Sequence, residues 1–435
     1  MKPYENFNDE WKRTKPDFVI YRPQDVGGPD YENQHVIVNR TPGGDLLAIW
    51  TSATREDDVD QRVVCARSTD QGRTWSEPQH LDGPGEDDDH IASWAFPIIS
   101  QTGRIYCFYN KFIGFHDYGR GLTGVMLSLY SDDDGHTWMA GGEHPIRRTK
   151  IDHPDPQVPC NWIVWQNPSR DSQGRVLAGL TRRASPTYFA DCLRRPAGFT
   201  NWKEYSWFES QCEFMRFDNI NEGPHPQDLK ITFLPDDDSI LRVPHPGQPV
   251  VSYSQEPAIV LLPDGRFFTV MRTWTGRIYY SVSEDDGHTW RKPESLRHRD
   301  GGEEMLQPKS GCPLYVMRNG QYLLFYHNND GTIHGGTGPG DYLKNRWPLF
   351  AALGEYQPDA HQPIWFSQPK EFATTDGVGK PPIDEEGATA HNELGDYTSY
   401  TEDAAGRILW YPDRKVFLLG KTISDAWLSD MNVPR

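Results

Sequence analysis

The eight residues Ser283-Glu284-Asp285-Asp286-Gly287-His288-Thr289-Trp290 contain a pattern, S-x-D-x-G-x-T-W, that occurs twice more, at residues 68–75 and 131–138. The Asp side chain can accept hydrogen bonds from backbone N–H groups that follow it, and Gly allows a left-handed backbone. Each copy is therefore typical of a tight turn between two strands. Repetition of one such unit along a chain indicates a propeller, a solenoid or another repeat array.

A second pattern recurs around these turns. A short β-rich run, a turn that ends in Gly and another β-rich run follow one another six times in the chain, which is typical of antiparallel strand pairs. We interpret each pair as the first two strands of a blade, with the S-x-D-x-G-x-T-W turn joining strands three and four in three blades. The turn glycines are Gly44, Gly103, Gly174, Gly265, Gly320 and Gly406.

The sequence therefore predicts an all-β protein, a six-bladed β-propeller of four-stranded antiparallel blades, which closes a ring and hides its sheet edges. We expect residues 1–435 to form a single domain, with blades beginning near residues 34, 93, 161, 256, 311 and 396. Residues 18–22 precede the first unit and are expected to be the outer strand of the last blade. No helical periodicity of useful length argues for an α/β fold.

Composition limits the partners of the protein. The chain has 44 Lys and Arg against 62 Asp and Glu, a net charge of −18, which argues against nucleic acid or an anionic membrane as a partner. It has no apolar run of about 18 residues that could span a membrane. The polar N-terminus lacks a signal-peptide core, so we expect either a cytoplasmic protein or a trimmed form of a secreted or periplasmic one. Nothing indicates an oligomeric state.

Cysteine and acidic residues give no sign of a disulfide framework or a metal site. The acidic run 86–89 lacks the alternating ligands and central Gly of a calcium loop. No nucleotide or flavin motif is present, so we predict no cofactor and no metal. None of the six cysteines forms a C-x-x-C pair, and we expect mostly buried thiols: Cys65, Cys107, Cys160, Cys192, Cys212 and Cys312.

Three S-x-D-x-G-x-T-W turns among six β units resemble the Asp-box repeats of the sialidase (neuraminidase) superfamily, and the resemblance extends from about residue 31 to residue 423. It implies that the Asp-boxes lie on the face away from the active site. The site would then be formed by the starts of the first strands and by the loops between strands two and three. Asp-boxes are evidence for the fold more than for activity, because propellers that are not enzymes carry them too.

The resemblance also implies catalytic residues. The superfamily uses a Tyr nucleophile with a Glu partner and an Asp acid/base, and the matching positions are Tyr397, Glu256 and either Asp57 or Asp58. A phenol suits a substrate whose anomeric carbon bears a carboxylate, because the phenol stays neutral until a base removes its proton. We expect the Tyr397 hydroxyl and the Glu256 carboxylate to lie within hydrogen-bond reach.

Substrate-binding residues follow in the same way. Arg272 and Arg346 resemble the second and third of three arginines that hold the substrate carboxylate in the superfamily. The place of the first arginine reads Asn33-Gln34-His35-Val36, so a His replaces it. We expect His35 to act in catalysis or in substrate selection. Further substrate contacts are expected from Gln34, Arg55 and Arg120.

These residues predict an exo-acting glycoside hydrolase that removes a terminal acidic sugar from a glycan, and the missing first arginine argues against sialic acid as that sugar. One alternative is a polysaccharide lyase or an α-L-rhamnosidase-like enzyme that acts next to glucuronate, with His35 as the acid or base. Another is a glycan-binding propeller without catalysis. The set of Glu, Tyr, Arg and Asp side chains argues against binding alone, because binding needs no paired acid and nucleophile.

Overall fold

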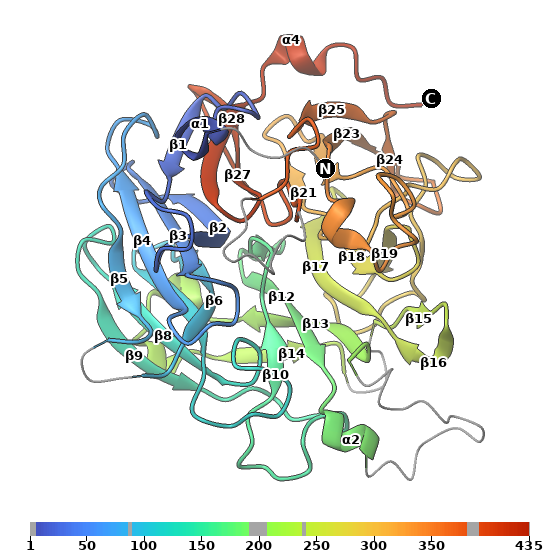
Figure 1. Cartoon of the computed structure of the whole chain (residues 1–435). Coiled ribbons are helices and arrows are strands. Elements are labelled where there is room, and N and C mark those ends of the chain that lie inside the picture. The colour runs from blue at the N-terminus through green and yellow to red at the C-terminus, as the bar shows by residue number, and fades with distance from the viewer. Residues whose placement is uncertain (1–5, 86–88, 191–206, 237–240, 381–390, 435) are drawn as a thin grey trace.

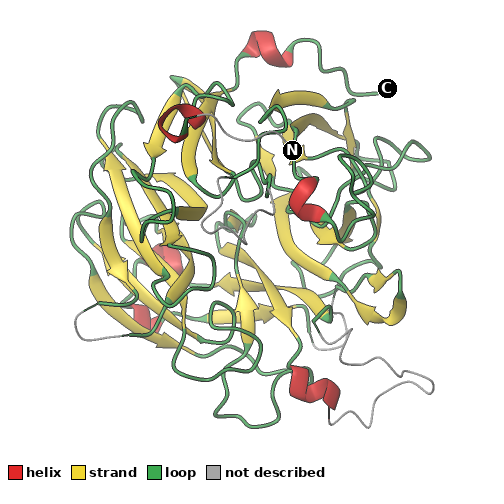
Figure 2. Cartoon of the chain, viewed as in Figure 1, coloured by secondary structure: helices red, strands yellow, loops and turns green. Residues whose placement is uncertain are grey.

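The computed structural model describes residues 6–85, 89–190, 207–236, 241–380 and 391–434. In these ranges six antiparallel sheets are arranged around a central axis, which confirms the six-bladed, all-β propeller (Figure 1). Among the regular elements, strands predominate over helices (Figure 2). The helices α1 (Phe7–Glu10), α2 (Pro186–Ala190) and α4 (Asp425–Leu428) are short, and no helix of the described ranges is long and apolar enough to cross a bilayer.

The first three blades follow the predicted order of strands. Blade one consists of β2 (Glu32–Arg40), β3 (Leu46–Ala53), β4 (Arg62–Ser68) and β5 (Gln79–Asp82). Blade two consists of β6 (Ala92–Ile99), β7 (Ile105–Lys111), β8 (Val125–Ser131) and β9 (Met139–His144). Blade three consists of β10 (Asn161–Ile163), β12 (Val176–Arg183), β13 (Ser210–Phe217) and β14 (Ile231–Leu234), with the short β11 (Ser169–Arg170) also paired to β12.

The last three blades complete the ring. Blade four consists of β17 (Ser254–Leu261), β18 (Phe267–Thr273), β19 (Tyr279–Ser283) and β20 (Glu294–Ser295). Blade five consists of β21 (Leu314–Val316), β22 (Tyr322–Tyr326), β23 (Leu349–Tyr356) and β24 (Ile364–Phe366), with β25 (Lys370–Ala373) also paired to β23. Blade six consists of β26 (Ser399–Asp403), β27 (Gly406–Asp413), β28 (Phe417–Thr422) and β1 (Phe18–Tyr21). Between blades three and four, β15 (Pro244–His245) and β16 (Gln248–Ser252) form a hairpin.

The N-terminal strand closes the ring as predicted. β1 pairs antiparallel with β28, with Phe18 opposite Gly420 and Val19 opposite Leu419. The N-terminal strand therefore completes the sheet of the last blade, so that the two ends of the chain share one sheet and β28 is not left as an unpaired edge.

The predicted turn glycines also lie where we expected them. Each is at the turn between the first and second strands of a different blade, and each has a positive φ, between 78° and 144°. Since strands one and two run antiparallel, these turns lie at the opposite end of each blade from the loops between strands two and three. The propeller therefore has one face of glycine turns and another face of longer loops.

The three Asp-boxes lie between strands three and four of blades one, two and four, on the face of the glycine turns. In the third copy, Asp285 accepts from the Thr289 N–H at 2.8 Å and from the Thr289 hydroxyl at 2.6 Å. The Ser283 hydroxyl accepts from the Gly287 N–H at 2.9 Å, and the Trp290 indole donates to the Gly287 carbonyl at 3.1 Å. The turn is thus held by side-chain hydrogen bonds that the repeat itself supplies.

We expect Asp285→Ala to lower the free energy of unfolding by about 1–2 kcal/mol, because two hydrogen bonds to Thr289 are lost at about 1 kcal/mol each. Urea denaturation measures the change. Asp359→Ala is the matched control, because Asp359 is exposed and none of the described interactions involves its side chain. Equal stability of the two variants would contradict a structural role for the Asp-box carboxylate.

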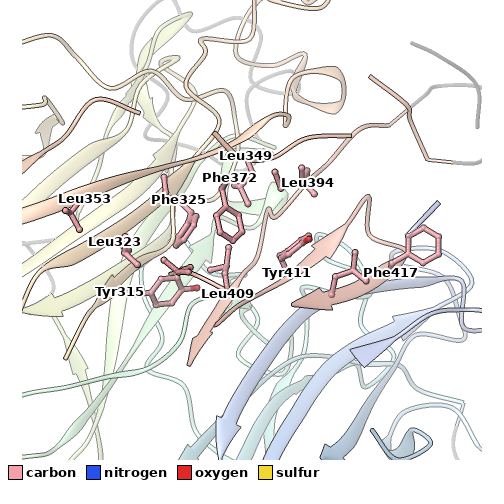
Figure 3. Packing of buried hydrophobic residues seen from close by; sticks show 14 of the residues in the cluster. Tyr315, Leu323, Phe325, Leu349, Leu353, Phe372, Leu394, Leu409, Tyr411 and Phe417 are labelled. Carbon is pink, nitrogen blue, oxygen red and sulfur yellow. The ribbon is translucent and has the colours of Figure 1, made fainter. Parts of the chain in front are cut away.

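Apolar side chains fill the spaces between neighbouring blades. The cluster between blades five and six includes Phe325 and Phe372 of blade five and Leu409 and Tyr411 of blade six (Figure 3). This packing fixes blade six, whose first strand follows Tyr397. The five described cysteines are free and buried, as expected. Cys192 lies outside the described residues, and so do residues 86–88 of the acidic run.

Candidate active site

One position in each blade brings a residue to the axis of the propeller. Counting back nine residues from each turn glycine gives, in chain order, His35, Trp94, Trp165, Glu256, Gly311 and Tyr397. We call these six residues the axial ring. The rings of Trp165 and Tyr397, which come from opposite blades, are 4.1 Å apart between centroids. His35 lies 5.9 Å from Trp94 and 6.5 Å from Tyr397, and Trp94 lies 5.0 Å from Trp165.

Local backbone geometry turns three of these side chains out of the strand ladder. His35, Trp94 and Glu256 have φ values of 57°, 56° and 54°, and the pairing with the second strand shifts at each of them. A bulge of this kind re-aims a side chain. The Trp94 and Glu256 N–H groups donate to the hydroxyls of Thr51 and Thr181 of the preceding blade, at 3.0 and 2.6 Å. A left-handed backbone is costly for these residue types, and such strain clusters at functional sites.

Arg272 contacts both principal catalytic candidates, Glu256 and Tyr397. Its Nη1 donates to Glu256 Oε1 and to the Tyr397 hydroxyl, the latter at 3.2 Å. Tyr397, Glu256 and Arg272 are only 2%, 1% and 3% exposed. The direct hydrogen bond that we expected between Tyr397 and Glu256 is not formed, and Glu256 Oε2 has no hydrogen-bond partner. The expectation was wrong because one nitrogen of the Arg272 guanidinium contacts both groups in place of a direct bond between them.

The charges of this group set its acid–base behaviour. Burial raises the pKa of Glu256 to about 7, against the lowering effect of the Arg272 charge. Burial, followed by the charges of Asp396 and Glu256, also raises the pKa of Tyr397 well above its usual range. Glu256 therefore changes charge near neutral pH, as a general base should. Tyr397 remains a neutral phenol until a base takes its proton.

Asp57 lies at the rim of the same face, in the loop between β3 and β4. Its N–H donates to Gln61 Oε1 at 2.8 Å, and its carboxylate lies against Gly121, whose carbonyl accepts from the Trp94 indole. Asp57 is exposed at this rim, with Gly121 close to its carboxylate. Burial, followed by the charge of Glu56, raises the pKa of Asp57 to about 6. Because no described contact joins the Asp58 carboxylate to this group, the geometry favours Asp57.

Arg346 lies beside the site, but its donors are occupied. Nη1 contacts the carboxylates of Glu393 and Asp396, while Nε and Nη2 donate to the Lys309 carbonyl at 3.2 and 2.8 Å. Asp396 precedes Tyr397 in the chain and also accepts from the Gly311 N–H at 3.1 Å. The protein's own carboxylates hold this guanidinium, and the substrate-binding role expected of Arg346 stays a prediction.

His35 is fully buried, and its ring nitrogens make no hydrogen bond of ordinary geometry. Burial lowers the pKa of His35 to about 3, although the nearby Val164 carbonyl favours the protonated form. Gln34 is buried beside it in β2. Arg55 is exposed in the Asp57 loop, and Arg120 is half-buried next to Gly121, so both lie on the face of loops as expected.

Several residues of this site were missed by the sequence predictions. Trp94 and Trp165 belong to the axial ring, and their distance from the turn glycines was the signal that could have identified them. Asp396, Arg183 and Lys309 lie around Glu256 and Arg272, as the effects of these charges on one another's pKa values indicate. Local sequence carries no comparable signal for these three. Among the described residues, no group of three or more His, Cys, Asp or Glu side chains could hold a metal ion.

Comparisons with known proteins agree with this fold. No curated protein sequence matches the chain. A protein of unknown function from Dyadobacter fermentans superposes with a TM-score of 0.57 at 13% identity, over 94% of this chain and 96% of that one. The intramolecular trans-sialidase of Ruminococcus gnavus gives 0.57 at 14% identity, over 96% and 99%. The α-L-arabinanase of Penicillium chrysogenum gives 0.52 at 14% identity, over 96% and 99%.

At these identities the structural matches establish the fold alone. They agree with the resemblance to sialidases, and they include a glycosidase that acts on a different sugar. A family model described as a BNR repeat-like domain matches residues 44–408. Since this match covers most of the sequence, the chain belongs to the BNR repeat-like family.

Proposed function

We propose that the protein is an exo-acting glycoside hydrolase that removes a terminal acidic sugar from a glycan. The observation that carries the proposal is the contact of one guanidinium, Arg272, with both Glu256 and Tyr397. It places a carboxylate that titrates near neutral pH close to a phenol, which is the pairing a tyrosine nucleophile needs. The sialidases and the arabinanase among the structural neighbours support glycosidase chemistry without naming the sugar.

In this proposal Glu256 takes the proton of Tyr397 as the phenolic oxygen attacks the anomeric carbon. Asp57 donates its proton to the leaving oxygen, and the glycosidic bond breaks. Asp57, now ionised, then removes a proton from water, whose oxygen attacks the anomeric carbon and breaks the glycosyl–tyrosine bond. Glu256 gives the proton that it took back to the departing Tyr397 oxygen, so Asp57 ends protonated and Glu256 ends ionised, as at the start. Two displacements at one carbon retain its configuration. The Trp165 ring packs against the Tyr397 ring and holds the phenol in place.

The observations give less support to a lyase that depends on His35. Its ring contacts Trp94 and Tyr397, and no carboxylate of the described residues orients it. With a pKa of about 3, the ring is a weak base and holds no proton to donate at neutral pH. A lyase would also leave Asp57 without a role.

The test is an assay of 4-methylumbelliferyl glycosides of glucuronate, N-acetylneuraminate and glucose, side by side. We expect hydrolysis of an acidic glycoside in preference to the glucoside, and the NMR spectrum of the first product should show the original anomeric configuration. The control is an oligosaccharide in which glucuronate carries a sugar on O4, because elimination needs a leaving group at that carbon and released methylumbelliferone itself absorbs in the ultraviolet. A rise in ultraviolet absorbance with this oligosaccharide would indicate an unsaturated product and a lyase, and inversion of configuration in the glycoside assays would exclude the Tyr397 mechanism.

A further inference from the structure

Near Glu256 lie two cations, Arg183 and Lys309, that form no ion pair with a carboxylate of the described residues. Arg183, at the end of β12, donates to the Tyr118 hydroxyl at 2.9 Å and to the Gln255 amide oxygen at 3.2 Å, both neutral acceptors. Its Nε is buried without a hydrogen-bond partner. The neighbouring residue Arg182 is different, because its guanidinium binds the carboxylates of Glu213 and Asp152. The contrast indicates that Arg183, unlike Arg182, has no carboxylate of the described residues in direct contact with its guanidinium.

Lys309 is a second cation of this kind. Its ammonium group lies over the rings of Tyr342, Trp274 and Tyr253, at 4.5, 4.7 and 5.6 Å from their centroids, and it makes no hydrogen bond to the described residues. Aromatic faces attract a cation but do not neutralise it. The Lys309 carbonyl accepts from Arg346, so the main chain at this position is fixed. The lysine is therefore held in place without a carboxylate partner among the described residues.

The two cations converge with Arg272 around one hydroxyl. Burial, followed by the charges of Arg272, Arg183 and Arg346, lowers the pKa of Lys309 well below its usual range. The Lys309 ammonium group lies over the Tyr253 ring, and the charges of Arg272 and Arg183 act on the hydroxyl of the same residue. That buried hydroxyl and Arg272 Nε make no hydrogen bond to the described residues. Buried donors and charges without partners are costly unless a ligand pairs with them.

We propose that Arg183, Lys309, Arg272 and the Tyr253 hydroxyl bind the carboxylate of the substrate sugar. This inference rests on the proposed function only in taking the anion to be part of a sugar. Charge-assisted hydrogen bonds from guanidinium and ammonium groups suit a carboxylate. The site draws its cations from blades three, four and five. It therefore replaces both the first arginine, which His35 has displaced, and Arg346, which Glu393 and Asp396 occupy.

The position of the site has a consequence for protonation. Arg183, Arg272 and Arg346 repel the proton of Lys309, while Glu256 attracts it. Tyr253, Trp274 and Tyr342 face the ammonium group with their rings. A bound carboxylate adds a negative charge and must raise the pKa of Lys309. At a pH above the pKa of Lys309 in the free protein, ligand binding therefore takes up a proton.

Titration calorimetry of the full-length protein with D-glucuronate, N-acetylneuraminate and D-glucose tests the proposal. We expect one of the two acids to bind at least about tenfold more tightly than glucose, and the acid that binds more tightly shows whether the carboxylate is uronic or lies on the anomeric carbon. Arg183→Gln and Lys309→Met should each weaken that binding by about 10- to 100-fold, the effect of one lost charge-assisted bond. Arg183→Lys should restore part of it.

The matched controls are Arg73→Gln and Lys292→Met, which remove exposed cations from the Asp-box face and should leave binding unchanged. Titrations at alkaline pH in two buffers of different ionisation enthalpy should show proton uptake that Lys309→Met abolishes. Equal binding of acids and glucose, or acid binding unaffected by both site variants, would overturn the inference. Binding of a free sugar requires no catalysis. Acid binding without hydrolysis of any glycoside would therefore contradict the proposed hydrolase and still support the proposed anion site.

Discussion

Tyr397→Phe is expected to lower kcat/KM by at least about a thousandfold on any glycoside that the protein cleaves, because losses of this size follow removal of a nucleophile. The substitution deletes only the hydroxyl. The ring that packs against Trp165 and His35 remains, and Arg272 keeps its contact with Glu256. The loss should therefore appear in activity and not in the thermal unfolding temperature.

Tyr400→Phe is the matched control for this variant. Tyr400 is three residues further along blade six, and its hydroxyl donates to Glu402 at 2.9 Å, on the strand that leads away from the axial ring. We expect its activity to stay within about threefold of the parent protein, because a single surface-side hydrogen bond contributes about 1 kcal/mol or less. If Tyr397→Phe retained more than a tenth of the activity, another group would have to be the nucleophile.

The fold could be predicted from the sequence because it repeats. Each turn glycine and each Asp-box is a local signal, and the six glycine turns and three Asp-boxes reinforce one another. The same repetition contained more than we used: the axial ring lies nine residues before each turn glycine, and that count alone would have placed Trp94 and Trp165 beside Tyr397. A spacing that recurs in every blade predicts which residues reach the axis as well as where the strands lie.

The charge pairing of the site could not be predicted in this way. Arg346 follows the superfamily pattern in its local sequence, yet Glu393 and Asp396, which lie some fifty residues further on, hold its guanidinium. Arg183 and Arg182 are adjacent in sequence, and only the arrangement in space shows that one has carboxylate partners and the other does not. Which cation is available for a substrate depends on contacts between distant segments, and no local pattern records them.

Asp57→Asn should change the dependence of activity on both pH and the leaving group. In the proposed mechanism the reactive form has Asp57 protonated and Glu256 ionised. Their pKa values are about 6 and about 7, so the acid titrates below the base. At pH below both values Glu256 is protonated and kcat/KM falls. At pH above both values Asp57 is ionised and kcat/KM falls again. The parent protein should therefore show a bell-shaped profile with limbs near these two values.

Removing the acid leaves only the ionisation of Glu256. In Asp57→Asn, kcat/KM should rise with pH through about 7 and then stay constant, so the alkaline limb disappears and the acidic limb moves up. The loss should be about 100- to 10,000-fold for an alkyl glycoside, whose leaving oxygen needs a proton, and much smaller for a nitrophenyl glycoside. Asp58→Asn is the matched control and should keep the bell. If the alkaline limb instead vanished in Asp58→Asn, Asp58 would be the acid. If the alkaline limb survived in both variants, the proton donor would have to lie outside this loop. The resemblance to the superfamily would then extend to Tyr397 and Glu256 but not to the acid.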